Sequence, residues 1–199
     1  MSKLFAWEYE GLLTKEAAQA LLMAVSDLFY EAIHAAWDEW LSLPVNTRLK
    51  ISAMQRGGFV HDLIVFHAKD KLSTASKIEI AQTTPFFAVY VNDDTIVRFK
   101  KLQEDYVAVP ATEHGKLFYN NAPMSCLRPF CNRLTCGYVL DRFGNEVVDI
   151  AFTLQVRDEV VWKISLSEMA YAPDSPDHSP EPQAPVIQPL APPSQAEEF

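Results

Sequence analysis

Apolar residues recur at three- and four-residue spacing in the first quarter of the chain, which is the period of a helix that buries one face. The pattern runs from Thr14 to Leu43 without Gly or Pro, and Pro44 ends it. Thr14 suits the N-cap, because its side-chain oxygen can accept a hydrogen bond from a free backbone N–H group. We expect one long helix over 14–43 with a buried aromatic stripe, a partner face being the second interpretation. The stripe consists of Phe29, Trp37 and Trp40.

A second helical pattern follows over 47–71 and contains the pair Gly57-Gly58. Each glycine costs about 1 kcal/mol relative to alanine inside a helix. We therefore expect the helix to kink or split at this pair, into 47–56 and 59–71. The positions expected to face the core are Phe59, Leu63 and Phe66.

The pattern then changes to alternation, which predicts a β-hairpin of strands 86–91 and 95–102. The residues between them, Asn92-Asp93-Asp94, are all turn formers. We favour a three-residue loop, because it places apolar residues opposite one another, whereas a two-residue loop would mix apolar and basic side chains. The expected pairs are Val89 with Val97 and Phe87 with Phe99, and the other face carries Phe86, Ala88, Tyr90, Ile96, Arg98 and Lys100.

Three further apolar runs, 134–140, 146–156 and 160–166, predict an antiparallel meander. The segment 103–133 is expected to be irregular apart from one helical turn at 112–119. These elements predict a single α+β domain over 1–171, helical over 14–71 and β-rich over 86–166. Its N-terminal helices would pack on one face of a roughly five-stranded, mainly antiparallel sheet.

The last 28 residues have a different composition. Residues 172–199 hold eight of the thirteen prolines, five acidic residues and no Gly, Lys or Arg. Such a segment cannot bury enough apolar surface to offset its ordering entropy. We expect a disordered, acidic, Pro-rich tail, which could also shield a basic face of the same molecule.

The formal charge of −9 over 199 residues is distributed unevenly. Residues 1–45 carry −5 and residues 172–199 another −5, whereas 46–116 carry +2. No apolar run approaches the roughly 20 residues that span a bilayer, and the N-terminus lacks the pattern of a secretory signal. Three cysteines fit reduced thiols better than a disulfide framework. We expect a soluble, cytoplasmic protein without membrane contact.

One candidate for catalysis is Arg56, followed after four residues by His61. This spacing resembles the R-x4-H motif of HEPN-type ribonucleases, which are all-helical, whereas the second half of this chain is β-rich. The resemblance implies that His61 acts as general acid or base and that Arg56 stabilises a phosphate oxyanion. Local packing of His61 beside a solvated Arg56 is the alternative.

A candidate for nucleic-acid binding is the basic run on strand 95–102. Strand alternation places Arg98 and Lys100 on one side, about 7 Å apart, with Tyr90 beside them and Lys101 next in sequence. Basic and aromatic side chains together can bind phosphates and stack bases. The alternative is a charged solvent face that protects a sheet edge.

No metal or cofactor site is expected. Cys126, Cys131 and Cys136 lack the closer C-x2-C spacing of zinc sites, so buried or inert thiols are the better interpretation. The run Arg98-Phe99-Lys100 has Arg where the E-x-K of a PD-(D/E)xK nuclease needs a metal ligand. Phosphate-binding, dinucleotide and zinc-protease motifs are missing from the sequence.

A broader resemblance covers most of 45–166. The strings TRLKISAMQRGGFVHD, VRFKKLQED, LTCGYVLDRFG and VVWKISL are similar to uncharacterised bacterial proteins encoded beside helix-turn-helix regulators in mobile or defence islands. The resemblance implies a toxin–antitoxin or phage-defence context and transfers no catalytic residue. Our first hypothesis is an interaction protein whose acidic helix and tail bind a protein partner. An RNA-targeting toxin and non-catalytic nucleic-acid binding are the alternatives, and the sequence leaves the oligomeric state open.

Overall fold

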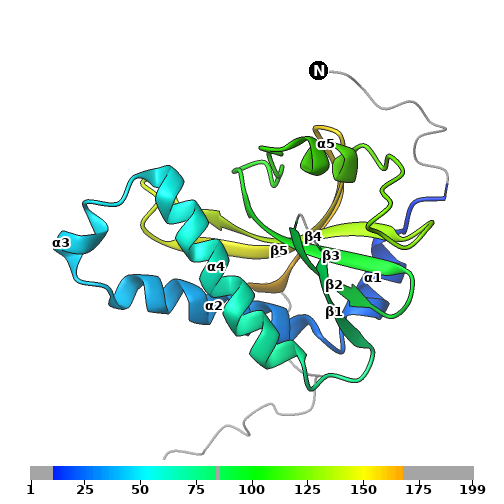
Figure 1. Cartoon of the computed structure of the whole chain (residues 1–199), viewed down its shortest axis with the longest axis horizontal. Helices are drawn as coiled ribbons and strands as arrows, with labels where there is room; N and C mark the ends of the chain where they lie inside the picture. Colours follow the sequence, from blue (N-terminus) through cyan, green and yellow to red (C-terminus); the bar gives the residue numbers. More distant parts are fainter. Residues whose placement is uncertain (1–10, 84–85, 168–199) are drawn as a thin grey trace, which may run out of the picture.

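The computed structural model describes residues 11–83 and 86–167 (Figure 1). Helices come first and a mixed sheet follows, which confirms the α+β class. The expected tail 172–199 and the end of the expected domain, 168–171, lie outside the described residues. The elements are α1 (Lys15–Leu22), α2 (Ser26–Ser42), α3 (Val45–Arg48), α4 (Ala53–Leu72), β1 (Ile78–Thr83), β2 (Phe86–Val91), β3 (Thr95–Leu102), α5 (Glu113–Tyr119), β4 (Asn132–Leu140), β5 (Val147–Val156) and β6 (Glu159–Ser165).

The sheet has six strands in the order of the sequence, β1 to β6. Four neighbouring pairs are antiparallel, but β3 and β4 are parallel. The sheet is mainly antiparallel, as expected, but the expectation of roughly five strands missed β1, and it did not foresee the parallel pair of β3 and β4. A parallel pair needs a long crossover, and here the crossover is the segment 103–131, which contains α5.

The register of the β2–β3 hairpin is as predicted. Val89 pairs with Val97, and Asn92, which begins the three-residue loop, has a φ of 55°. Phe87 stacks on Phe99 with ring centroids 6.0 Å apart. This register places Phe87, Val89, Val97 and Phe99 on the same face of the hairpin. A shift of one residue would pair them with side chains that point to the other face.

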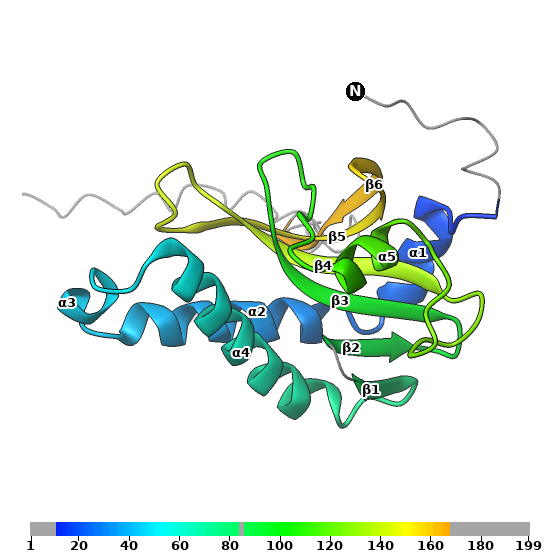
Figure 2. The ribbon, with the colours of Figure 1, turned by 45° about the horizontal axis from the view of Figure 1, so that its top comes forward.

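The main core lies between the sheet and the helices α1, α2 and α4, which cover one face of it (Figure 2). The ring of Phe29 on α2 lies 5.4 Å from that of Phe99 and 5.1 Å from that of Phe152. Trp37 and Trp40 are also buried. The expected aromatic stripe of the first helix is thus confirmed as core.

The expected helix over 14–43 is interrupted. The predicted cap is confirmed, since the Thr14 hydroxyl accepts from the Ala17 amide, but α1 ends at Leu22 and α2 begins at Ser26. The Ser26 hydroxyl donates to the carbonyl of Met23 at the break. The break lets α1 pack against β6 while α2 packs against β4 and β5.

Helix α4 differs from its prediction in both its start and its buried face. It runs through Gly57-Gly58 without a break, and the interruption comes earlier, where Ser52 and Gln55 form a capping box. The expected core positions Phe59 and Phe66 are exposed. Two neighbouring faces of the helix both carry apolar residues, so periodicity alone could not choose between them. The buried positions are Val60, Ile64, Ala68 and Leu72.

A second, smaller core covers the opposite face of the sheet. The helix α5, whose helical turn was predicted, and the rest of the crossover pack against Tyr90, Ile96 and Leu102 (Figure 1). Gly137 on β4 lies against β3, because a Cβ there would clash with the carbonyl oxygen of Lys100 and with the side chain of Leu102. Both faces of the central strands are therefore covered.

Candidate protein-interaction surface

Exposed apolar side chains gather where α2, α3 and α4 meet, at the left of Figure 1. Leu49 is 78% exposed and Met54 is 88% exposed, and Leu41 and Val45 are also exposed. The chain here connects two long packed helices, and α3 lies beyond the end of the sheet (Figure 2).

The same segment is cationic. Residues 40–61 contain Arg48, Lys50 and Arg56 and no Asp or Glu. The Arg48 side chain is partly used within the fold, because its Nε donates to the carbonyl of Leu43 over 3.2 Å. Lys50 is exposed.

Arg56 joins this segment to the turn between β4 and β5. Its Nη1 donates to the carbonyl of Gly144 over 2.7 Å. Gly144 has a φ of 71°, a backbone conformation that favours glycine, and a Cβ there would lie 2.7 Å from Nη2 of Arg56. The turn adds Phe143, which is exposed, with the Arg142 guanidinium 4.5 Å from its ring centroid. We call the two segments together, 41–56 and 141–146, the tip.

The acidic residues of α2, which were expected to bind a basic partner, are largely engaged within the helical layer. Three side-chain contacts use them, with His67 and Lys71 coming from α4. The pairs are Glu31 with Lys71 (2.8 Å), Asp38 with His34 (3.0 Å) and Glu39 with His67 (2.9 Å). Glu31 and Glu39 therefore link α2 to α4, whereas the contact of Asp38 with His34 lies within α2.

The side chains of the predicted catalytic residues Arg56 and His61 do not form one site. Arg56 holds the β4–β5 turn, and five residues along a helix turn His61 by about 140° away from it. Within 11–83 and 86–167, no hydrogen bond joins the two side chains. Burial, followed by the nearby positive charge of Lys100, lowers the pKa of His61 below its ordinary value of 6.5 and so disfavours the protonated ring.

The predicted nucleic-acid face of β3 is largely covered. Arg98 is 8% exposed and its guanidinium lies 4.9 Å from the centroid of the Phe118 ring. Tyr90 is also buried, and its hydroxyl accepts from the Arg128 amide over 3.0 Å. Only Lys101 is well exposed, while Lys100 is half-buried and burial lowers its pKa.

The structure thus corrects both interpretations of this face. An open platform built on Arg98 and Tyr90 is not present, because α5 and the crossover lie over it. A charged face that protects a sheet edge is wrong as well, since β3 lies between β2 and β4. The crossover that covers β3 follows from the parallel pairing, which strand alternation could not reveal.

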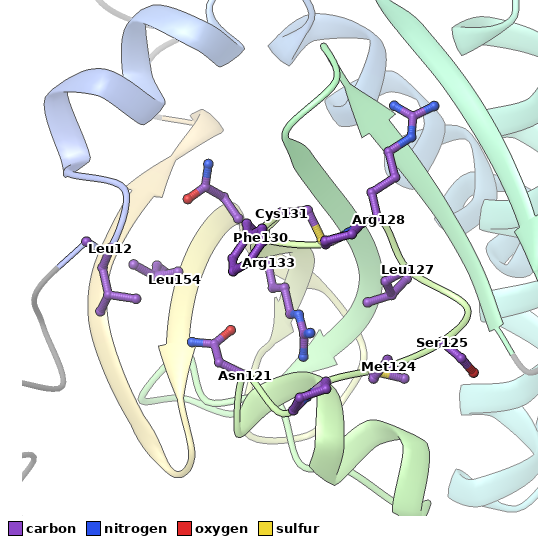
Figure 3. Close-up of a pocket in the computed structure, with 14 residues that line it drawn as sticks. Leu12, Asn121, Met124, Ser125, Leu127, Arg128, Phe130, Cys131, Arg133 and Leu154 are labelled. Atoms are coloured by element: carbon purple, nitrogen blue, oxygen red, sulfur yellow. The ribbon is translucent and has the colours of Figure 1, made fainter.

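A cavity of about 940 Å³ lies at the other end of the sheet (Figure 3). Leu12 before α1, Leu154 on β5 and the loop that leads to β4 form its walls. Its two arginines are already engaged by the protein. Arg128 pairs with Glu79 and Asp93, and Arg133 donates to the carbonyls of Leu117, Phe118 and Ala122.

No sequence pattern indicates this cavity, because its walls come from segments far apart in the chain. Phe130 stands at the cavity wall, fully exposed and with a φ of 59°. With the guanidinium groups held by carboxylates and carbonyls, the cavity offers mainly apolar wall to any ligand.

The three cysteines are free thiols, of which Cys136 is buried and Cys126 and Cys131 are partly buried. Cys136 is buried, which raises the pKa of its thiol well above the ordinary value, and burial also raises that of Cys131. In the part of the chain that the structure describes, no cluster of His, Cys, Asp and Glu could hold a metal ion. No helix among the same residues is long and apolar enough to cross a membrane.

Comparison of the chain with family models, with curated proteins and with solved structures finds no match. Function is therefore argued from the surfaces of the molecule.

Proposed function

We propose that this protein is an interaction protein and that its tip binds an acidic, partly apolar segment of a protein partner. The observation that carries the proposal is the exposure of Leu41, Leu49 and Met54 beside Arg48 and Lys50, in a segment without a single carboxylate. Single exposed apolar side chains are common on proteins, but a cluster of them is typical of a binding site.

The chemistry of the tip defines the partner. Burying apolar surface stabilises a complex by about 25 cal/mol per Å², and the lysine and arginines attract a partner of opposite charge and orient it. The acids of α2 are paired with α4, so we place the partner on the tip and not on the acidic helix face. A bacterial toxin–antitoxin or phage-defence module in the cytoplasm remains our proposal for the setting.

The proposal is tested by comparing captured proteins between tip variants and a matched control. The tip variant carries Leu49→Ser and Met54→Ser, and the control carries the same kind of change at two exposed positions of the opposite side, Val109→Ser and Leu117→Ser. Tagged full-length chains are expressed in a bacterial host, and co-purifying proteins are quantified by mass spectrometry. We expect a protein captured by wild type and control to fall at least tenfold with the tip variant.

Equal capture by all three chains would contradict the proposal. The same host also tests the RNA-targeting alternative, because growth and RNA integrity can be followed after induction. Growth arrest with RNA cleavage that His61→Ala abolishes, with the chain still folded, would replace our proposal with the ribonuclease hypothesis.

A further inference from the structure

We propose that the tip also binds a segment of its own chain, the C-terminal residues 172–199, which compete there with the partner. This inference rests on the proposed function, because it concerns the regulation of the same surface. Three independent features of the molecule support it: the place where the described chain ends, the length of chain that follows, and the complementary chemistry of the two segments.

The described chain ends beside the tip. Leu166 is buried in the main core, and Ser167 lines a recess together with Asp38 and Leu41 of α2 and Glu146 of the β4–β5 turn. Leu41 and Glu146 both belong to the tip. The last described residue therefore lies next to the surface that we propose the C-terminal segment covers.

The remaining sequence can easily reach the rest of the tip. Thirty-two residues follow Ser167, and ten residues in extended conformation already span about 33 Å. Attachment to the domain gives such a segment an effective concentration of about 1 mM. At that concentration, an intrinsic dissociation constant of about 0.1 mM keeps the tip about 90% occupied.

The two segments are complementary in charge and polarity. Residues 172–199 contain five carboxylates and no Lys or Arg, whereas residues 40–61 contain three cations and no carboxylate. The tail also carries apolar side chains at Val186, Ile187 and Leu190 that match the exposed Leu49 and Met54. Its eight prolines restrict the backbone, which reduces the entropy lost on binding.

The acidic groups near this path mostly have a hydrogen-bond partner within the fold. Asp38 lies 3.0 Å from His34 and Glu39 lies 2.9 Å from His67. The Asp141 carboxylate accepts from the backbone amides of Phe143, Asn145 and Glu146, and these hydrogen bonds lower its pKa. Glu146 is exposed at the recess, so we place the acidic stretch of the tail on Arg48 and Lys50, beyond it.

The test measures amide hydrogen exchange by mass spectrometry on the full-length chain. Peptides that cover 41–56 report on the tip, and peptides that cover 109–119 serve as an internal reference. The tail variant keeps its full length but loses its five carboxylates, and a control variant loses three exposed carboxylates of the folded part. The tail changes are Asp174→Asn, Asp177→Asn, Glu181→Gln, Glu197→Gln and Glu198→Gln, and the control changes are Asp70→Asn, Glu104→Gln and Asp158→Asn.

We expect exchange at 41–56 to be about tenfold faster in the tail variant than in wild type, in line with 90% occupancy. Exchange at 109–119 should not change, and the control variant should behave as wild type. Raising NaCl to 0.5 M should reproduce the effect of the tail variant, because salt screens surface charges. Equal exchange at 41–56 in wild type and tail variant would overturn the inference.

A second measurement identifies the occupant. A synthetic peptide of residues 172–199 is added to the full-length tail variant and its binding is followed by fluorescence anisotropy, beside a peptide of the same composition in scrambled order. Saturable binding of the native order that Lys50→Ser weakens supports the inference. Equal binding of both peptides would show charge attraction only and would overturn it.

Protection that grows with protein concentration would show that the tail of a second copy occupies the tip, which would also overturn the intramolecular contact. Failure of the proposed function looks different, because tip protection does not depend on any partner. If capture by wild type and tip variant is equal but protection is observed, the partner hypothesis fails and the tail contact stands. If the tail variant captures the partner no better than wild type and shows no change in exchange, only the regulation fails.

Discussion

The two ends of helix α4 use similar residues in opposite ways. In its C-terminal part Val60, Ile64, Ala68 and Leu72 are almost fully buried against the sheet. Before and at its first turn, Leu49 and Met54 are among the most exposed apolar side chains in the described part of the chain. The difference lies in what is underneath, because the sheet supports one end and not the other. Apolar content alone therefore does not decide burial, and the end without support is the one available for binding.

This comparison predicts that stability and binding can be separated by substitution. Changes over the sheet should lower the free energy of unfolding, whereas changes at the tip should leave it almost unchanged.

The largest expected effect is that of Phe99→Ala on β3. Phe99 is 1% exposed and its ring stacks between those of Phe29 and Phe87. Truncating a buried phenylalanine to alanine costs about 3–5 kcal/mol, which urea denaturation followed by circular dichroism would measure. Phe66→Ala, the same change at an exposed ring on α4, is the control. A loss below about 1 kcal/mol for Phe99→Ala would contradict the described core.

A second pair of substitutions adds one methyl group at a closed and at an open position. In Gly137→Ala the new Cβ would lie 2.6 Å from Cγ of Leu102 as well as against the Lys100 carbonyl, so we expect a loss of about 3 kcal/mol. In Gly57→Ala the new Cβ has nothing within 4 Å, so we expect a gain of up to about 1 kcal/mol. Thermal unfolding of both variants would show shifts of opposite sign. A Gly137→Ala variant as stable as wild type would mean that β3 and β4 are not as close as described.

A smaller effect on the free energy of unfolding is expected from His61, which lies near the middle of α4. Its pKa in the folded state is below the ordinary 6.5, so the unfolded chain binds the proton more readily. The His61 contribution to stability is therefore present above pH 6.5 and is lost as the pH falls from there toward the lower folded pKa. We expect His61→Gln to remove this part of the decline, measured as the free energy of unfolding at pH 8 and at pH 5.5. An unchanged decline would show that the ring is not buried beside Lys100.

The smallest expected effect on stability is at the tip itself. Leu49→Ser and Met54→Ser should each change the free energy of unfolding by less than about 0.5 kcal/mol, since both side chains face solvent. Together, the two changes should lower partner capture at least tenfold. Loss of more than about 2 kcal/mol in urea denaturation would mean that the tip is part of the core, which would remove the basis of the comparison.

The candidate site was only partly accessible from the sequence. The basic and aromatic residues Tyr90, Arg98 and Lys100 do lie on one face of the hairpin, as alternation required, but alternation says nothing of what covers that face. Arg56 and His61 stand at a suggestive spacing, yet Arg56 holds the Gly144 carbonyl instead of sharing a site with His61. The tip was missed because a sequence pattern does not distinguish exposed Leu and Met residues from buried ones. Leu49 and Met54 would be assigned to the core from the sequence alone.

The sequence by itself determined the local structure of this protein. The cap at Thr14, the three-residue hairpin loop, the pairing of Val89 with Val97 and the helical turn of α5 follow from interactions between residues close along the chain. Such interactions act over a few residues and are therefore visible in a short pattern. The tertiary structure alone decided the parallel contact of β3 with β4, the burial of Arg98 and the exposure of Leu49. These depend on which distant segments meet, and the free energy that selects them comes from surface buried between segments far apart in sequence.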